Sequence, residues 1–86
     1  MDNTTRRTDQ SVLAHIQQLV DEEHRLFEQG ERGIVGEAER HRLAKVQVEL
    51  DQCWDLLRQR RALREVGQDP SMAQVRSAQI VENYEQ

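Results

Sequence analysis

Apolar residues recur every three or four positions along two stretches of the chain, and this spacing is the period of one face of an α-helix. The first stretch contains Val12, Leu13, Ile16, Leu19, Val20, Leu26 and Phe27. The second contains Leu43, Val46, Leu50, Cys53, Trp54 and Leu57. A connector with three glycines, residues 30–36, joins them. Because so short a connector makes its two helices antiparallel neighbours, the pattern predicts an all-α fold built on a helical hairpin.

The same pattern divides the chain into three parts. We expect a disordered leader over 1–7, a helical hairpin over 8–66, and a C-terminal tail over 67–86. Within the hairpin the expected order is a helix at 8–29, a turn at 30–36 and a helix at 37–66. The tail contains scattered apolar residues, namely Met72, Val75, Ile80, Val81 and Tyr84. We therefore expect it to dock on the hairpin as a strap or a short third helix.

Local signals mark the ends of both helices. The first helix has three possible N-caps, because Thr8, Asp9 and Ser11 each carry an oxygen that accepts from free backbone N–H groups. Glycine enters the left-handed conformation that stops a helix without penalty, so Gly30 is expected to end the first helix and Gly67 the second. In the connector, Ile34 and Val35 are expected to tuck under the turn.

A chain of 86 residues is too small to bury a large core. Two amphipathic helices cannot cover each other's apolar stripes completely, and the leftover surface, including Leu56, Leu63 and part of Trp54, would be large for a monomer. We therefore expect a homodimer in which two hairpins form a four-helix bundle. The expected anchors of the core or of the interface are Ile16, Leu19, Leu50, Trp54 and Leu57.

Arginines crowd the end of the second helix, at Arg58, Arg60, Arg61 and Arg64. Guanidinium groups bind carboxylates and phosphates through paired hydrogen bonds, so the cluster could contact an anion or a partner. It could equally pair with acids of the leader, of the helix itself (Asp51, Asp55) or of a partner chain. The net charge of −4 and the absence of interleaved aromatic residues argue against nucleic acid as the partner.

The remaining reactive side chains give weaker signals. His24 follows Asp21 by three residues, and the hairpin would bring His41 and Glu37 near them, which makes a metal site conceivable. The second helix otherwise faces inward with apolar residues, so we expect no metal and no other cofactor. Cys53 is the only cysteine, which excludes an intrachain disulfide, and its mid-helix apolar position predicts an inert thiol.

Several classes of protein are disfavoured by what the sequence lacks. The chain contains no apolar run long enough to cross a bilayer, and its start lacks the apolar segment of a signal peptide. We therefore expect a cytoplasmic protein without a membrane partner. The sequence also lacks a nucleophile triad, a phosphate-binding glycine loop and paired zinc cysteines. Because a helical hairpin offers no deep pocket, we expect a protein that is not an enzyme.

Residues 50–63 resemble the first long helix of the all-helical chorismate mutases, in which an arginine binds the substrate. The resemblance would give that role to Arg58 or Arg61. Those enzymes need two further helices that carry a lysine and a Glu/Gln pair, whereas about twenty residues follow here and none is lysine.

A second resemblance spans nearly the whole chain. It rests on Glu22-Glu23-His24-Arg25-Leu26 in the first helix, on the run from Val48 to Arg61 that includes Glu-Leu-Asp-Gln-Cys-Trp-Asp-Leu-Leu-Arg, and on the Gly-x-Asp-Pro break at 67–70. In these features the chain resembles a family of short actinobacterial proteins of unknown function. The resemblance implies a helical cytosolic protein and brings no catalytic residues. Our hypothesis is a non-catalytic interaction or scaffold module whose partner is a second copy or an unidentified protein. The alternative is an anion, nucleic-acid or regulatory binding module that uses residues 58–64.

Overall fold

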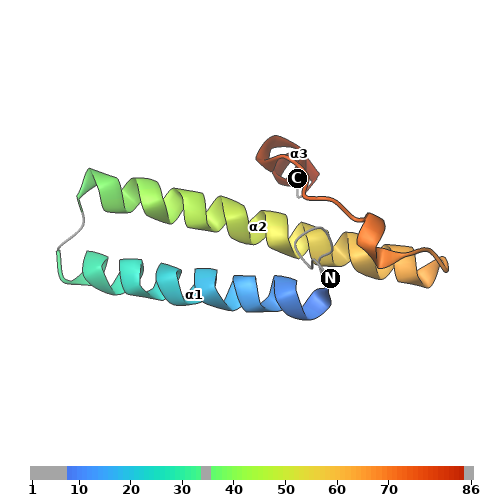
Figure 1. The fold of residues 1–86 in the computed structure, drawn as a ribbon. Helices are drawn as coiled ribbons and strands as arrows, with labels where there is room; N and C mark the ends of the chain where they lie inside the picture. The colour runs from blue at the N-terminus through green and yellow to red at the C-terminus, as the bar shows by residue number, and fades with distance from the viewer. Residues whose placement is uncertain (1–7, 34–35, 85–86) are drawn as a thin grey trace.

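Two long antiparallel helices dominate the computed structural model, which describes residues 8–33 and 36–84 (Figure 1). Helix α1 spans Asp9–Glu31 and α2 spans Glu37–Glu65. A short 3-10 helix, η2 (Pro70–Met72), and a terminal helix, α3 (Ala78–Tyr84), follow. The described residues contain no strand, so the all-α hairpin expected from the sequence is confirmed. The leader at 1–7 and the expected plug at 34–35 lie outside the described residues.

The helix ends agree with the sequence signals except at one glycine. Thr8 caps α1: its hydroxyl accepts from the Ser11 backbone N–H, and the Ser11 hydroxyl accepts from the Thr8 N–H, both at 3.0 Å. The prediction that Gly30 ends α1 is wrong, because the helix continues through it to Glu31. Gly33, with φ of 71°, takes the left-handed conformation instead. Gly67 has φ of 75° and follows the end of α2 as expected.

The apolar core forms between the facing sides of α1 and α2. Its buried residues are Val12, Ile16 and Leu19 from α1, and Val46, Leu50, Cys53 and Leu56 from α2. Leu57 is half-buried and packs against this cluster. Three of the expected anchors, Ile16, Leu19 and Leu50, are therefore core residues, and Leu57 lies at the edge of the core.

Trp54 does not anchor this core. Its side chain is 46% exposed, whereas Leu56 two positions later is 1% exposed. The core part of the prediction is therefore wrong for Trp54. The physical reason is angular: successive helix residues are about 100° apart, and once Cys53 points at α1, Trp54 must lie on the flank. Its role in an interface with another chain stays a prediction.

The tail returns along α2 rather than extending from it. We call residues 67–77 the strap; it contains η2 and leads to α3, and both η2 and α3 contact α2 (Figure 1). Val81 of α3 is buried, at 1% exposure. Other apolar side chains of the tail stay in solvent, since Met72 and Val75 of the strap and Ile80 of α3 are all more than half exposed. The tail therefore combines the two conformations expected of it, a strap and a short helix.

Candidate interaction surface

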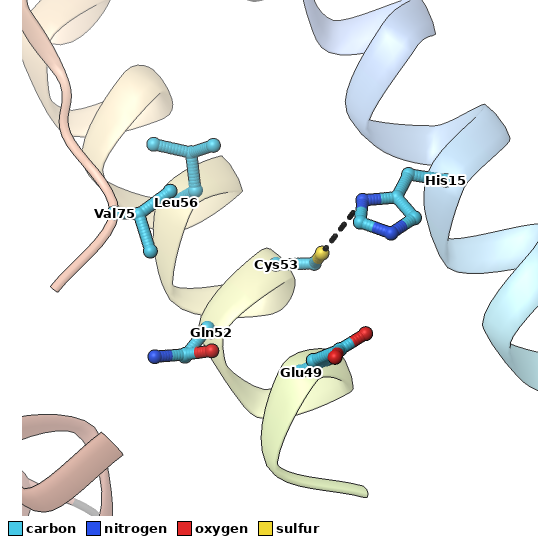
Figure 2. Close-up of a pocket in the computed structure, with 6 residues that line it drawn as sticks. All are labelled: His15, Glu49, Gln52, Cys53, Leu56 and Val75. Atoms are coloured by element: carbon cyan, nitrogen blue, oxygen red, sulfur yellow. Dashed lines mark hydrogen bonds between the residues drawn. The ribbon is translucent and has the colours of Figure 1, made fainter. Parts of the chain in front are cut away.

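The hairpin has two flanks, and the strap covers only one of them. Residues that come one position before a core residue lie on the covered flank: His15 precedes Ile16, and Gln52 precedes Cys53. Both line a cavity of about 110 Å³ together with Val75 of the strap, as Figure 2 shows. We call this flank the strap side. Residues that come one position after a core residue lie on the opposite flank, which we call the open side.

An ion pair between a buried carboxylate and a partly exposed arginine fastens the strap. Asp55 of α2 is completely buried, and its carboxylate accepts two hydrogen bonds from the guanidinium of Arg76, one of them from Nε at 2.9 Å. Gln59 Nε2 donates to the same carboxylate at 2.9 Å. The hydrogen bond from Arg76 is the main reason that the pKa of Asp55 is lowered, and the Gln59 bond lowers it further. Asp55 therefore stays ionised in the folded protein.

Backbone groups of the strap receive the other contacts. Gln52 Nε2 donates to the Arg76 carbonyl at 3.1 Å, and Gln59 Nε2 donates to the Gln74 carbonyl at 2.7 Å. These amides satisfy carbonyls that no regular secondary structure pairs. Together with Asp55, they show that the polar residues of α2 on the strap side bind this chain's own tail.

A second ion-pair cluster joins the start of α1 to the end of α2. Arg60 Nε donates to Asp9 at 2.5 Å, and Arg64 Nη2 lies 2.8 Å from the same carboxylate. Arg60 is buried and also donates to the Pro70 carbonyl at 3.3 Å. Hydrogen bonds from Arg60 and Arg64, in that order, lower the pKa of Asp9. These two arginines therefore act within the chain, joining α1, α2 and the strap.

The other two arginines of the cluster lie on the surface. Arg58 approaches Asp55 only to 3.9 Å, and Asp55 is already bonded to Arg76. Within the described residues, Arg61 has no ion pair. Both line a shallow hollow of about 140 Å³ with Trp54 and Leu57. The cluster predicted from the sequence is thus split into a structural pair and an exposed pair.

Apolar side chains also gather on the open side. Leu13 follows the core residue Val12, and Trp54 follows Cys53; these side chains are 47% and 46% exposed. Phe27 lies fourteen residues after Leu13, two heptads along the same face of α1, and is 46% exposed. Val20, midway between them, is half-buried against the core. The open side therefore presents an apolar stripe with Arg58 and Arg61 at one end.

The reactive side chains do not assemble into a catalytic or metal centre in the part of the chain that the structure describes. Cys53 Sγ lies 3.7 Å from His15 Nδ1 at the edge of the core (Figure 2), and the thiol is buried. No three His, Cys, Asp or Glu side chains among the described residues gather closely enough to hold a metal ion. His24 and His41 are both exposed.

Of the residues in these clusters, the sequence indicated Asp55 as a candidate partner for arginines, but it indicated neither Arg76 nor the pairing of Asp9 with Arg60. Arg76 lies in a tail with little pattern, and Asp9 was considered only as a helix cap. For Asp55 the sequence did contain a signal of burial. Asp55 lies on the face of α2 opposite the core, about 180° from it, yet its neighbours in the sequence are apolar. Nothing local to Asp55 specifies Arg76, which is 21 positions away. Such a pair depends on how the tail folds back.

Comparison with known proteins places the chain in a family. The family described as "Protein of unknown function (DUF2630)" matches residues 8–86. The chain belongs to this family. Uncharacterized proteins of Mycobacterium tuberculosis and Mycobacterium bovis are 54% identical to it over 78 residues, which cover 90% of this chain and 90% of each relative. The resemblance to a short actinobacterial family of unknown function is therefore confirmed.

The function of the DUF2630 family is unknown. No solved structure matches the chain. Among the described residues, no helix is both long and apolar enough to span a bilayer. For this member of the family, a function must therefore be argued from the two flanks of the hairpin.

Proposed function

We propose that this DUF2630 protein is a non-catalytic, cytoplasmic interaction module that binds through its open side and forms a homodimer. The observation that carries the proposal is the apolar stripe: Leu13, Phe27 and Trp54 are each nearly half exposed on one flank of a small hairpin. Large apolar side chains grouped on one face mark interaction sites more often than isolated ones do. The strap covers part of the opposite flank, where it contacts Gln52, Gln59 and Arg60 of α2.

The charged residues support a role without catalysis. The carboxylates with lowered pKa values, Asp9, Glu22 and Asp55, all owe the change mainly to hydrogen bonds from arginines. Catalytic acids and bases usually have their pKa values moved toward neutrality. In this chain the movement is in the opposite direction, as expected of carboxylates that hold a structure together.

The test is the solution mass of the protein by sedimentation equilibrium across a concentration series. We expect the wild type to be a dimer at micromolar concentration and Leu13→Glu to be a monomer, because the substitution places a charge in the stripe. The matched control is Val75→Glu, which puts the same charge on an exposed apolar residue of the strap side and should leave the dimer intact. A wild-type monomer that folds cooperatively would contradict the homodimer.

A second candidate function follows from the hollow beside Trp54. Arg58 and Arg61 lie next to an exposed indole, and guanidinium groups recognise carboxylates and phosphates. In this alternative the module binds an anion or a nucleic acid. It predicts salt-dependent binding of a single-stranded oligonucleotide that is lost in Arg58→Gln/Arg61→Gln. The fluorescence of Trp54, the only tryptophan, would report it, and an unchanged spectrum would exclude it.

A further inference from the structure

We propose that two copies pair through their open sides in antiparallel orientation, about a two-fold axis that passes beside Val20 at right angles to the helices. The arginine end of each copy, residues 58–64, then lies over the turn end of the other, residues 28–33 and 36–40. This arrangement rests on the proposed homodimer and specifies which residues meet in it.

The stripe on α1 is symmetric about Val20. Leu13 and Phe27 lie seven residues on either side of it, or about 10 Å in each direction at about 1.5 Å per residue. A two-fold axis at Val20 brings the two copies of Val20 together and places Leu13 of each copy opposite Phe27 of the other. An isologous interface needs a surface that is its own complement, and this stripe meets that condition.

The same axis also matches the apolar residues on α2. The contacts His15–Cys53 and Asp9–Arg60 fix how α1 and α2 lie alongside each other. They place Val20 level with the middle of α2, between Leu43 and Trp54. Rotation about the axis therefore carries Trp54 toward Leu43 of the second copy, so its exposed indole meets an apolar side chain. In such a bundle every helix has antiparallel neighbours, as in up-and-down four-helix bundles.

Charge selects this orientation over the other two-fold pairing of the open sides. Residues 58–64 include four arginines and no acid, and Asp9 already pairs with Arg60 and Arg64. Residues 28–33 and 36–40 include four glutamates, Glu28, Glu31, Glu37 and Glu39, against two arginines. Antiparallel pairing places the basic end over the acidic end twice. The alternative, with the axis along the helices, would place the two arginine ends together, and like charges in contact oppose association.

The arrangement is tested by disulfide cross-linking of single cysteines in a Cys53→Ser background. A disulfide needs Cα atoms about 4.4–6.8 Å apart, so it reports close proximity. We expect Val20→Cys to form a covalent dimer on mild oxidation. Leu13→Cys alone should not cross-link, because its two copies would lie about 21 Å apart along the direction of the helices. An equimolar mixture of Leu13→Cys and Phe27→Cys should give the mixed dimer.

The outcomes separate this arrangement from the proposed homodimer. Circular dichroism first checks that Cys53→Ser folds, with Cys53→Ala as the replacement background if it does not. If the wild type sediments as a dimer while Val20→Cys stays uncross-linked, or if Leu13→Cys alone cross-links as readily, the antiparallel arrangement is wrong and the homodimer stands. If the wild type sediments as a monomer, both proposals fail.

Discussion

At the scale of single residues, the contribution of a large side chain to stability depends on whether it faces the core or lies on the flank of its helix. Leu56 is 1% exposed and contacts the core from α2, whereas Trp54 is 46% exposed. We expect Leu56→Ala to lower the free energy of unfolding by about 2–5 kcal/mol, through lost burial and the cavity left behind. Trp54→Ala should cost less than about 1.5 kcal/mol in the monomer, because half of its surface is already in water.

Urea unfolding followed by circular dichroism checks both values at a protein concentration that is low enough to disfavour dimers. The comparison is informative because removing a tryptophan normally costs more stability than removing a leucine, whereas here we expect the reverse. A larger loss for Trp54→Ala than for Leu56→Ala under these conditions would contradict the placement of the core.

The pairing of the buried Asp55 carboxylate with Arg76 makes stability depend on pH. The pKa of Asp55 is lowered in the folded state by the hydrogen bond from Arg76, while the unfolded chain has the ordinary value of about 3.9. The contribution of this group is therefore fully present above about pH 5, and it is lost as the pH falls through the folded value. Asp55→Asn should lower stability at pH 7 and weaken its decline in acid.

Unfolding free energies at about pH 7, 5 and 3 measure this effect. Asp51→Asn is the control. It also removes a carboxylate from α2, but among the described residues Asp51 forms no ion pair. Some acid sensitivity should remain in Asp55→Asn, since arginine hydrogen bonds also lower the pKa values of Asp9 and Glu22. An Asp55→Asn variant that declines in acid as steeply as the wild type would refute this role.

At the scale of elements, the glycines of the connector differ in backbone conformation, and so in the effect expected when each is replaced by alanine. Gly30 lies inside α1, where glycine costs roughly 0.5–1 kcal/mol relative to alanine. Gly33 has φ of 71°, a conformation that costs a non-glycine residue about 1–2 kcal/mol. We therefore expect Gly30→Ala to raise the melting temperature and Gly33→Ala to lower it. Thermal unfolding compares the two variants directly, and changes in the same direction would contradict the observed end of α1.

The hairpin could be predicted from the sequence because its signals are local. Apolar residues at helical spacing specify α1 and α2, and Gly67 with Asp69-Pro70 specifies the end of α2. The assignment of Gly30 as the stop failed because three glycines lie within seven residues and only the backbone conformation shows which one turns. Asp55–Arg76 and Asp9–Arg60 could not be predicted, because each joins segments brought together only by the folded chain.

At the scale of the whole molecule, the fold is two-sided. The strap buries its polar contacts with Asp55, Gln52 and Gln59 on one flank, which leaves the other flank to make contacts outside the chain. The division explains why the arginine cluster is split. Arg60 points into the junction of α1, α2 and the strap, while Arg61, one residue later, lies on the open side.

This two-sidedness leads to a prediction about salt. If the exposed arginines lie over the acidic turn end of a second copy, reversing one of them should weaken the dimer. We expect Arg61→Glu to raise the dissociation constant by up to about tenfold at low salt, because an attractive contact at the rim becomes repulsive at both ends of the dimer. The difference should shrink near 1 M salt, where the screening length is about 3 Å.

The matched control for Arg61→Glu is Lys45→Glu, which changes the net charge by the same amount on an exposed residue of α2 that does not belong to the open side. Sedimentation equilibrium of both variants at about 0.05 M and 1 M salt compares them. A general effect of net charge would weaken both dimers equally, because the whole molecule is acidic and each change makes it more so. A specific effect weakens only Arg61→Glu. Equal weakening would therefore remove the electrostatic argument for antiparallel pairing and leave the apolar stripe as its sole support.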